Sequence, residues 1–387
     1  MIAITAATLL TPQDRIEHAL LLVEDGIISR ITTREHREIP TGRPVVDYGD
    51  AVLAPGFIDI HVHGASGNDV MEASPEALPC IEQSLAKHGV SAYLPTTVTA
   101  PLETTIAALS RLADSIERSA KEIPGHLRAR PIGIHLEGPF ISHVRRGVHP
   151  VKNLLRPSLD IFNQFWEASR GHIRVMTIAP ELEGASEVIE EAVTRGICVS
   201  LGHSDATLEI TRAAVDAGAR HATHLFNAMR PLAHRDPGIV GEALVNPRLS
   251  VEIIADGIHL DPAIVKLIVR AKGQDNIILI TDGTAATGMP DGRYHLGTFE
   301  FDVKDGVCLS DGKLAGSTLT MDRAIQNVMK FAEYDLHQAL VLATSNPGRV
   351  TGPPNTGQLR VGGAADIVVL SPAGEVRNTI IGGVGIS

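Results

Sequence analysis

Six residues that could bind a metal or transfer a proton stand at or near the ends of apolar segments of the chain. They are four histidines and two carboxylates: His61, His63, Glu137, His203, His224 and Asp282. Imidazoles and carboxylates are ligands that suit a divalent metal ion. Gathered in one place, these groups would favour metal-assisted hydrolysis with a carboxylate as the general base.

Each of these residues also has an ordinary explanation when it is taken alone. The chain has 17 histidines, so a His-x-His pair such as His61 and His63 can arise by chance. Asp282 precedes a glycine, as turn residues often do, and Glu137 could be a solvated carboxylate at a strand end. The joint pattern favours the metal site, because each candidate belongs to the end of a separately predicted strand.

The apolar segments predict the elements that must position these residues. Eight segments have the length and character of buried strands, and helix-like segments separate most of them. The predicted strands are residues 56–63, 91–98, 131–138, 173–180, 197–204, 222–227, 251–258 and 277–283, and the predicted helices include 78–88, 104–118, 186–195 and 208–217. Gly89, Gly196 and Gly218 follow three of these helices, as glycines at helix ends often do.

The alternation of side chains along a strand places the candidate residues on common faces. In the first predicted strand, Asp59, His61 and His63 share one face, and in the third Glu137 shares a face with His135. Eight strand–helix repeats over about 250 residues predict an α/β protein with a (β/α)8 barrel, whose reactive groups lie at the carboxyl ends of the strands. A doubly wound open sheet is the alternative, but it would usually carry a glycine-rich phosphate turn after its first strand, which this sequence lacks.

Both ends of the chain contain short strand-like segments. At the amino end they are residues 2–10, 19–23, 27–31 and 45–47, with a turn at 24–26. Two predicted helices, 318–333 and 336–343, follow the eighth strand, and the chain then returns to strands at 358–361, 366–370 and 376–381. We therefore expect one small β-sandwich domain, built from residues 1–53 plus 357–387, beside a catalytic barrel of residues 54–356.

Composition narrows the classes of partner and compartment. A net charge of −11 disfavours binding to nucleic acid or to a membrane surface. The three cysteines are far apart in the sequence, which argues against a disulfide framework and favours a reducing compartment. The sequence has no apolar run long enough for a membrane span and no basic leader, so we expect a cytoplasmic protein.

Seven motifs give the chain a resemblance to known proteins. They are PGFIDIHVHG at 55–64, GIHLEGPF at 133–140, GHSDA at 202–206, THLFNAM at 223–229, IADGIH at 254–259, TD at 281–282 and LAGSTLTMD at 314–322. On these motifs the chain resembles the amidohydrolase superfamily and, within it, the deacetylases of amino-sugar phosphates. The His-x-His pair marks only the superfamily, whereas the second, third and fourth motifs together are much more specific.

The resemblance implies a ligand set for metal. Glu137, His203 and His224 would be the principal ligands, and His61 with His63 would hold a second ion that shares Glu137. Relatives that replace the strand-one pair use one metal; this chain keeps the pair, so one or two divalent ions per subunit remain open. Zinc is the expected ion, with iron, manganese and cobalt as alternatives.

The resemblance also implies which residues contact a phosphosugar substrate. They are Val148, His149 near the N-acetyl group or sugar, Asn227 and Ala228 beside the phosphate, His259 at the sugar or carbonyl, the closing loop Leu314, Ala315 and Gly316, and Arg235, which a neighbouring subunit of a homodimer would supply. Arg145 and Arg146 have two open interpretations, a solvated loop or a contact to the phosphate.

The implied activity is that of a hydrolase acting on a linear amide, in amino-sugar catabolism or recycling. The substrate would be N-acetyl-D-glucosamine 6-phosphate and the products D-glucosamine 6-phosphate and acetate. We expect Asp282 to take a proton from the attacking water and return it to the leaving amine, while His149 or the metal stabilises the oxyanion.

Three alternative functions are weighed against this one. N-acetylgalactosamine 6-phosphate is the nearest alternative substrate, because it differs in the orientation of one hydroxyl group. Glu137 and residues 227–235 argue against a cyclic-amide hydrolase such as a dihydroorotase. A non-catalytic scaffold with the same fold is disfavoured, since such proteins generally lose metal ligands or the catalytic aspartate and this chain keeps them all.

Overall fold

A barrel of eight parallel strands forms the larger part of the computed structural model, which describes residues 1–36, 42–121, 126–352 and 356–387. Its strands are β8 (Phe57–Val62), β11 (Val90–Thr97), β13 (Ile134–Glu137), β14 (Ile173–Ile178), β15 (Cys198–Leu201), β16 (His221–Ala222), β17 (Ser250–Ile253) and β18 (Ile277–Leu279). They pair in this order, and a bridge between Val62 and Gly283 brings the end of the first strand to the residues after the last. The predicted barrel is confirmed.

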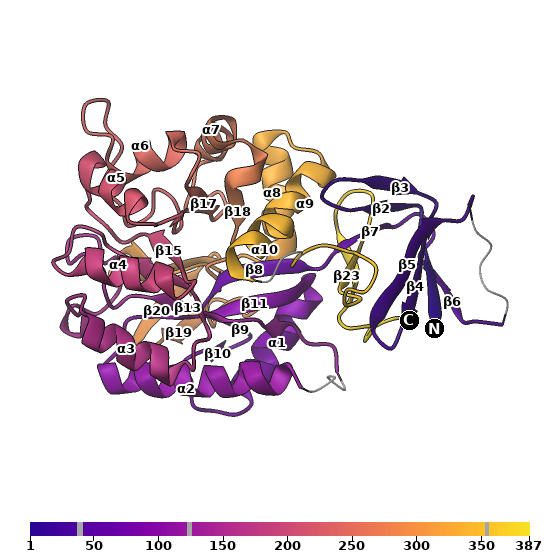
Figure 1. Cartoon of the computed structure of the whole chain (residues 1–387), viewed down its shortest axis with the longest axis horizontal. Coiled ribbons are helices and arrows are strands. Elements are labelled where there is room, and N and C mark those ends of the chain that lie inside the picture. The colour runs from indigo at the N-terminus through magenta and orange to yellow at the C-terminus, as the bar shows by residue number, and fades with distance from the viewer. Residues whose placement is uncertain (37–41, 122–125, 353–355) are drawn as a thin grey trace.

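Helices cover the outside of the barrel (Figure 1). They are α1 (Ala77–Lys87), α2 (Leu102–Ser119), α3 (Leu159–Ala168), α4 (Ala185–Thr194), α5 (Leu208–Asp216), α6 (Gly238–Val245), α7 (Pro262–Lys272), α8 (Met321–Ala332), α9 (Leu336–Ala343) and α10 (Ser345–Thr351), with short 3-10 turns at Val151–Asn153 and Gln274–Asn276. In α8 the buried residues Met321, Ala324, Ile325 and Val328 recur at the spacing of one helical face. Of the helices in the described ranges, none has both the length and the apolar character that a bilayer span requires.

Local sequence signals fix several helix ends. At the start of α9 the Asp335 side chain accepts the N–H of Gln338, and the Gln338 side chain accepts the N–H of Asp335. Gly89, Gly196 and Gly218 have φ angles of 85°, 77° and 117° just after α1, α4 and α5. These angles are favourable only for glycine, which confirms that all three act as helix stops.

The two ends of the chain together build a β-sandwich, as predicted. One sheet contains β5 (Ile27–Thr33), β4 (Ala19–Glu24), β1 (Ile2–Thr5) and β6 (Val45–Asp47), and the other contains β24 (Val376–Ile380), β23 (Ile367–Leu370), β7 (Val52–Pro55), β2 (Thr8–Leu10) and β3 (Arg15–Glu17). Apolar side chains of both sheets share one core, in which Ile4, Leu21, Leu53 and Val369 are fully buried. Figure 1 shows both chain ends in this sandwich. The boundary between residues 53 and 54 stays a prediction, and β7 runs across it.

Two predicted strands of the sandwich have different bounds. The segment 2–10 is not continuous, because the chain turns at residues 6–7 and places β1 and β2 in different sheets. Residues 358–361 form turns and irregular chain instead of a strand. Leu359 still packs in the sandwich core, so its apolar character reflected burial without strand pairing.

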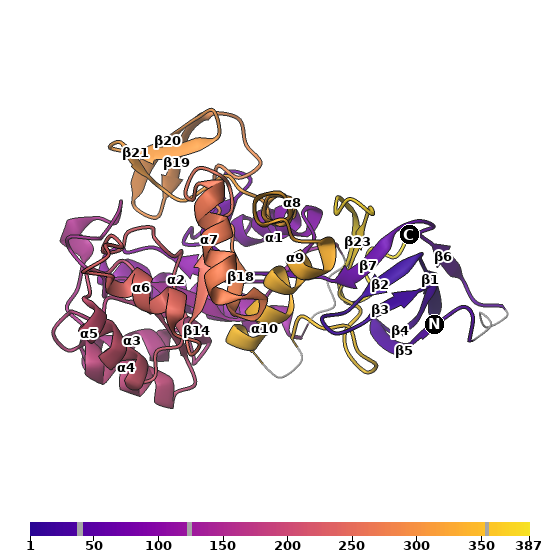
Figure 2. The same cartoon turned by 90° about the horizontal axis from the view of Figure 1, so that it is seen from above.

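An antiparallel sheet between β18 and α8, which we name the mouth sheet, was missed from the sequence. It consists of β19 (Gly292–Leu296), β20 (Phe299–Lys304), β21 (Val307–Ser310) and β22 (Lys313–Leu314), and Figure 2 shows it projecting from the barrel. Asp305-Gly306 and Asp311-Gly312 join its last three strands, with φ angles of 52°, 75°, 49° and 74°. Asp-Gly between alternating apolar residues is a strong hairpin signal that should have revealed it.

The remaining unpredicted elements are short or lie on the barrel surface. They are helices α3, α6, α7 and α10, the hairpin of β9 (Gly64–Ala65) and β10 (Asn68–Asp69), the strands β3 and β7, and the two-residue strand β12 (Arg130–Pro131) beside β11.

Candidate metal and active site

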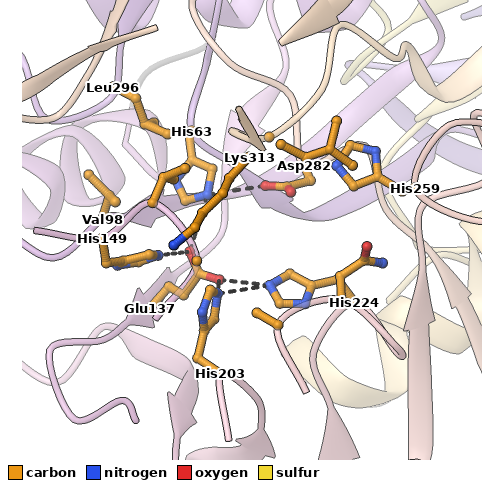
Figure 3. Close-up of a pocket in the computed structure, with 16 residues that line it drawn as sticks. His63, Val98, Glu137, His149, His203, His224, His259, Asp282, Leu296 and Lys313 are labelled. Atoms are coloured by element: carbon orange, nitrogen blue, oxygen red, sulfur yellow. Dashed lines mark hydrogen bonds and ion pairs between the residues drawn. The ribbon is translucent and has the colours of Figure 1, made fainter. Parts of the chain in front are cut away.

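Glu137 lies among three of the predicted histidine ligands at the mouth of the barrel (Figure 3). Its Oε1 is 3.2 Å from Nε2 of His203 and 3.1 Å from Nε2 of His224. Its Oε2 is 3.3 Å from Nε2 of His63. The carboxylate at the end of β13 therefore has its two oxygens toward different histidines.

Asp282 lies across the cluster, near the two histidines of the first strand. Its Oδ1 is 3.2 Å from Nε2 of His63 and 3.5 Å from Nε2 of His61. His61 Nε2 is also 3.5 Å from Oε1 of Glu137. The structure thus brings all six predicted metal and proton-transfer residues into one buried cluster.

Three of these residues have an unusual backbone conformation. His203, His224 and Asp282 have φ angles of 47°, 28° and 51°, in the left-handed region that non-glycine residues seldom occupy. Each follows the end of a barrel strand, at β15, β16 and β18. The fifth, sixth and eighth strands are accordingly shorter than predicted, because the chain leaves the extended conformation at or before these residues. Strain of this kind concentrates at functional sites.

Hydrogen bonds at Nδ1 prepare two histidines to act as ligands. The Nδ1–H of His63 donates to the carbonyl oxygen of Thr96, and that of His203 donates to the carbonyl oxygen of Arg145, both at 3.0 Å. A carbonyl oxygen can only accept, so the proton of a neutral ring is held at Nδ1. The Nε2 lone pair then faces the cluster, which is the usual arrangement of a metal-binding histidine.

The spacing of the donor atoms fits a metal ion. Ligands about 2.0–2.2 Å from an ion in a tetrahedral arrangement are roughly 3.4 Å from one another. The Nε2 atoms of His203 and His224 are 3.1 Å apart, and the contacts to Glu137 and Asp282 range from 3.1 to 3.5 Å. In addition, the buried Nε2 of His61 has no hydrogen-bond partner in the described part of the chain.

The surroundings keep both carboxylates ionised. Burial alone would raise the pKa of Glu137, but the positive charge of His61 in its protonated form and the Nε2 contacts of His203 and His224 outweigh burial and hold that pKa well below its usual value. Burial likewise opposes ionisation of Asp282, whose pKa is lowered by its contact with Nε2 of His63 and by the positive charge of His61 in its protonated form. Glu137 is thus an anionic ligand, and Asp282 can accept a proton.

His149 is a neutral imidazole beside the same cluster. Burial, together with the nearby charge of His203, lowers the pKa of His149 to about 3. Its Nδ1 lies 2.8 Å from Oγ1 of Thr99, and its Nε2 lies 3.7 Å from Oε2 of Glu137. A neutral ring in this position can form a hydrogen bond to a substrate without adding charge.

A cavity of about 340 Å³ opens above the cluster. Its lining consists of His63, Val98, Glu137, Gly147, Val148, His149, His203, His224, Asn227, Ala228, His259, Asp282, Leu296, Lys313, Leu314 and Gly316. Predicted metal and substrate residues therefore line one space, and the mouth sheet supplies part of its wall (Figure 3). His61 is fully buried and is not part of the lining.

Two predicted substrate residues do not line this cavity. Ala315 is fully buried, between Leu314 and Gly316, which do. Gly316 has a φ of 60°, and a Cβ at this position would lie 2.9 Å from the carbonyl oxygen of Asp282, so the close approach of this loop requires glycine. Arg235 is exposed on the 230–236 turn.

The two arginines of uncertain role are engaged elsewhere. Arg145 pairs with Asp205 at 2.7 Å, and Arg146 donates to the carbonyl oxygen of His149 at 2.9 Å. Neither lines the cavity, so both stabilise the loop that follows β13.

Among the charged residues of the site, sequence reasoning missed Glu252 and Lys313. Glu252, on β17, contacts the Nδ1 of His61 at 3.0 Å and is fully buried. Its position in the segment Val251-Glu252-Ile253, one polar residue inside an apolar strand, was the available signal. Lys313 reaches into the cavity from β22 (Figure 3), and it could be found only once the mouth sheet was recognised.

Comparisons with known proteins give a consistent result. The chain is 38% identical to N-acetylgalactosamine-6-phosphate deacetylase of Escherichia coli O157:H7, over 98% of this chain and 97% of that protein. It is 37% identical to N-acetylglucosamine-6-phosphate deacetylase of Bacillus subtilis, over 97% and 94% of the two chains. A mutant of the N-acetyl-D-glucosamine-6-phosphate deacetylase of Mycobacterium smegmatis, solved in complex with N-acetyl-D-glucosamine 6-phosphate, superposes with a TM-score of 0.91 at 33% identity and covers 100% of this chain and 99% of that one.

Residues 52–385 match the sequence profile of the amidohydrolase family. This range includes the whole barrel, every residue of the metal cluster and the carboxyl-terminal strands of the sandwich. The chain belongs to the amidohydrolase family.

Proposed function

We infer that this chain is a metal-dependent hydrolase that converts N-acetyl-D-glucosamine 6-phosphate to D-glucosamine 6-phosphate and acetate. The observation that carries this inference is the convergence of Glu137, His203, His224 and Asp282 on one cavity of sugar-phosphate size. Relatives named as deacetylases of the same class of substrate, matched along almost the whole chain, support it.

Glu137, His203 and His224 would hold the principal ion, and His61 with His63 would hold a second. Neutral imidazoles and carboxylates suit zinc, which we take as the native ion, ahead of iron, manganese or cobalt. A divalent ion bound here would increase the acidity of a water molecule and polarise the amide carbonyl.

Asp282 is the group we assign to proton transfer. It is buried at the cavity wall, its pKa is below the usual value, and so it is ionised at neutral pH. It accepts the proton of the attacking water and then donates it to the amine as the carbon–nitrogen bond breaks. His149, held by Thr99, lies on the other side of Glu137 and can donate a hydrogen bond from Nε2 to the developing oxyanion.

The substrate's phosphate needs cationic partners. Among the described residues that line the cavity, Lys313 is the one lysine or arginine, and its side chain extends into the cavity (Figure 3). Asn227 and Ala228 line the cavity on the loop after β16. We propose that Lys313 and these two residues bind the phosphate together with Arg235 of a second subunit, because Arg235 lies outside the cavity of its own chain.

Mixing two inactive variants tests the shared arginine. If a cytoplasmic homodimer is the active form, mixing an Arg235→Ala variant with an Asp282→Asn variant restores part of the activity, because one mixed site receives both intact residues. Unchanged inactivity after subunit exchange has been verified would count against a shared site.

N-acetyl-D-galactosamine 6-phosphate is the second candidate substrate. It is favoured by the relative from Escherichia coli O157:H7, whose identity to this chain is as high as that of the relative named N-acetylglucosamine-6-phosphate deacetylase. The two sugars differ at one hydroxyl group, so relative kcat/KM values decide between them.

The direct test of the proposed function is acetate release from a matched panel of sugars. The panel contains N-acetylglucosamine, N-acetylgalactosamine and N-acetylmannosamine, each with and without the 6-phosphate. We expect the highest kcat/KM with N-acetylglucosamine 6-phosphate, and loss of the activity with a chelator followed by recovery with zinc. Absence of acetate release from every phosphorylated sugar by metal-loaded protein would refute the deacetylase assignment and favour a scaffold role.

A further inference from the structure

A further buried carboxylate, Glu252, lies inside the barrel beside the metal cluster. Glu252 is on β17, has no exposed surface and accepts three hydrogen bonds. The donors are Nδ1 of His61 at 3.0 Å, Nε2 of His221 at 3.1 Å and the backbone N–H of His224 at 3.1 Å. A buried ionised carboxylate is expensive unless such partners compensate for the lost water, so this position is built for an anion.

The contact to His61 fixes the orientation of that ring. With Nδ1 bonded to Glu252, the opposite nitrogen, Nε2, is directed to the cluster, 3.5 Å from both Glu137 and Asp282. In the described part of the chain this Nε2 has no hydrogen-bond partner. The pairing of a histidine Nδ1 with a carboxylate is a common way to orient a metal ligand and increase its basicity.

The other histidines of the cluster do not depend on Glu252 in the same way. His63 and His203 are held by the carbonyl oxygens of Thr96 and Arg145. The contact of Glu252 with His224 is through the backbone, at the residue with a φ of 28°. His61 is therefore the ligand whose side chain Glu252 controls.

We propose that Glu252 is a positioning residue that enables the His61 side of the cluster to hold a second metal ion. This inference rests on the proposed metal-dependent function and deepens it, because it names the residue on which the number of ions depends. On the other side of the cluster, His203 keeps its support from the carbonyl oxygen of Arg145, and Glu252 reaches His224 only through the backbone N–H, so we expect that side to bind its ion without the side-chain contact of Glu252. His221 completes the arrangement, because its Nδ1 is 2.7 Å from Ser250 Oγ and its Nε2 is directed to Glu252.

Counting metal ions in the full-length protein at buffered free zinc tests this proposal. The variants are Glu252→Gln, which keeps the shape and one acceptor oxygen, and Glu252→Ala, which removes the contact. Glu242→Gln is the matched control, because Glu242 is also buried but lies on α6 and pairs with Arg212 and Asn246. Elemental analysis after equilibrium dialysis gives the ion count, and thermal unfolding gives the stability of each variant.

We expect two ions in the wild-type protein and in the Glu242→Gln control. Glu252→Ala should retain one ion, and Glu252→Gln should bind the second about 10- to 100-fold more weakly than wild type. Equal loss of both ions in the two Glu252 variants would assign the residue a structural role and overturn the proposal, as would two unaltered ions or a single ion in the wild type.

A double variant distinguishes a specific effect on His61 from general misfolding. If Glu252 acts through His61, adding Glu252→Gln to a His61→Ala background leaves the ion count at one and the affinity for that ion unchanged. A further loss in the double variant would contradict the proposed route. Acetate release by the wild type, measured in parallel, tests the proposed function separately, because that activity can be present whether one ion or two are bound.

Discussion

The sandwich core and the interior of the barrel near its mouth are both buried, and they are filled with opposite chemistry. The sandwich core is apolar, with Ile4, Leu21, Leu53 and Val369 fully buried between its sheets. The barrel interior instead holds carboxylates and imidazoles, among them Glu137 with 2% exposure and Glu252 with none. Apolar burial stabilises a fold, whereas buried charge is costly unless it is compensated.

This difference indicates that the sandwich mainly stabilises the fold, whereas the mouth of the barrel carries the catalytic chemistry. The sandwich consists of contacts that any well-packed small domain would make. The mouth of the barrel concentrates left-handed backbone at His203, His224 and Asp282, together with ionised groups close to one another. Substitutions in the two regions should therefore affect different measurements.

The largest effect is expected at Glu137. Glu137→Gln removes the charge that faces His63, His203 and His224, so the protein should lose bound metal and its acetate release should fall to background. The fold should persist, because the amide fits the same space. Elemental analysis and the acetate assay check this, and stoichiometric metal with substantial activity would remove Glu137 from the centre of the site.

Asp282 should separate chemistry from metal binding. Asp282→Asn should keep its metal but lower kcat by about 10²- to 10⁴-fold, the range for loss of a general acid–base group. KM should change little, since the amide keeps the shape of the wall. A variant that retains most of its kcat would show that another group transfers the proton.

In the sandwich the expected effect is on stability alone. Leu53→Ala leaves a cavity in a fully buried position and should lower the free energy of unfolding by about 2–5 kcal/mol. The folded variant should keep the wild-type kcat and ion count. Denaturant unfolding with kinetics at low temperature measures both, and a lowered kcat in the folded protein would mean that the sandwich helps to shape the site.

Glu82 tests a buried carboxylate outside the mouth. Burial raises its pKa from 4.5 to about 7, against the opposing charge of Arg128, and it pairs with the hydroxyl of Tyr93. Between pH 4.5 and about 7 the folded protein keeps the proton on Glu82, whereas the unfolded chain releases it. The free energy of unfolding therefore falls by roughly 3 kcal/mol as the pH rises through this range. Glu82→Gln should remove that decline in unfolding experiments at pH 5 and 8; an unchanged slope would place the titration elsewhere.

The smallest effect is expected at Lys313. Lys313 is an exposed residue, although its side chain reaches into the cavity, so Lys313→Met should raise KM for a 6-phosphorylated sugar by only about three- to tenfold, on the order of 1 kcal/mol. The unphosphorylated sugar is the matched control and should be unaffected. An equal change for both sugars would indicate a contact to the ring instead of the phosphate.

Much of the fold could be predicted because local patterns agreed with the tertiary structure. The helix 336–343 has the predicted bounds, and the glycine stops after α1, α4 and α5 hold the expected conformation. The strand ends were less predictable. The alternation of apolar and polar residues does not show at which residue the backbone stops being extended. The predicted strand 222–227 therefore continues through His224, whereas β16 ends at Ala222.

The site was predictable to the extent that its residues carry their own chemistry. Histidines and carboxylates at strand ends identify a cluster without any knowledge of distances. Glu252 could not be assigned in this way, because its role depends on partners 191 and 31 residues away in the sequence, His61 and His221. The exposed position of Arg235 depends on packing that no local pattern records.

The pairing of β7 with β23 has a consequence for biosynthesis. Residues 52–55 find their antiparallel partner at residues 367–370, more than three hundred positions later. At about 5–20 residues per second, a ribosome needs roughly 15 to 60 s to deliver that partner. During this interval the amino-terminal strands, rich in Leu, Ile and Val, have no complete sandwich to enter, and the ribosome synthesises the whole barrel. The amino-terminal strands are thus the last to complete their pairing, and we expect chaperones to bind this part of the nascent chain.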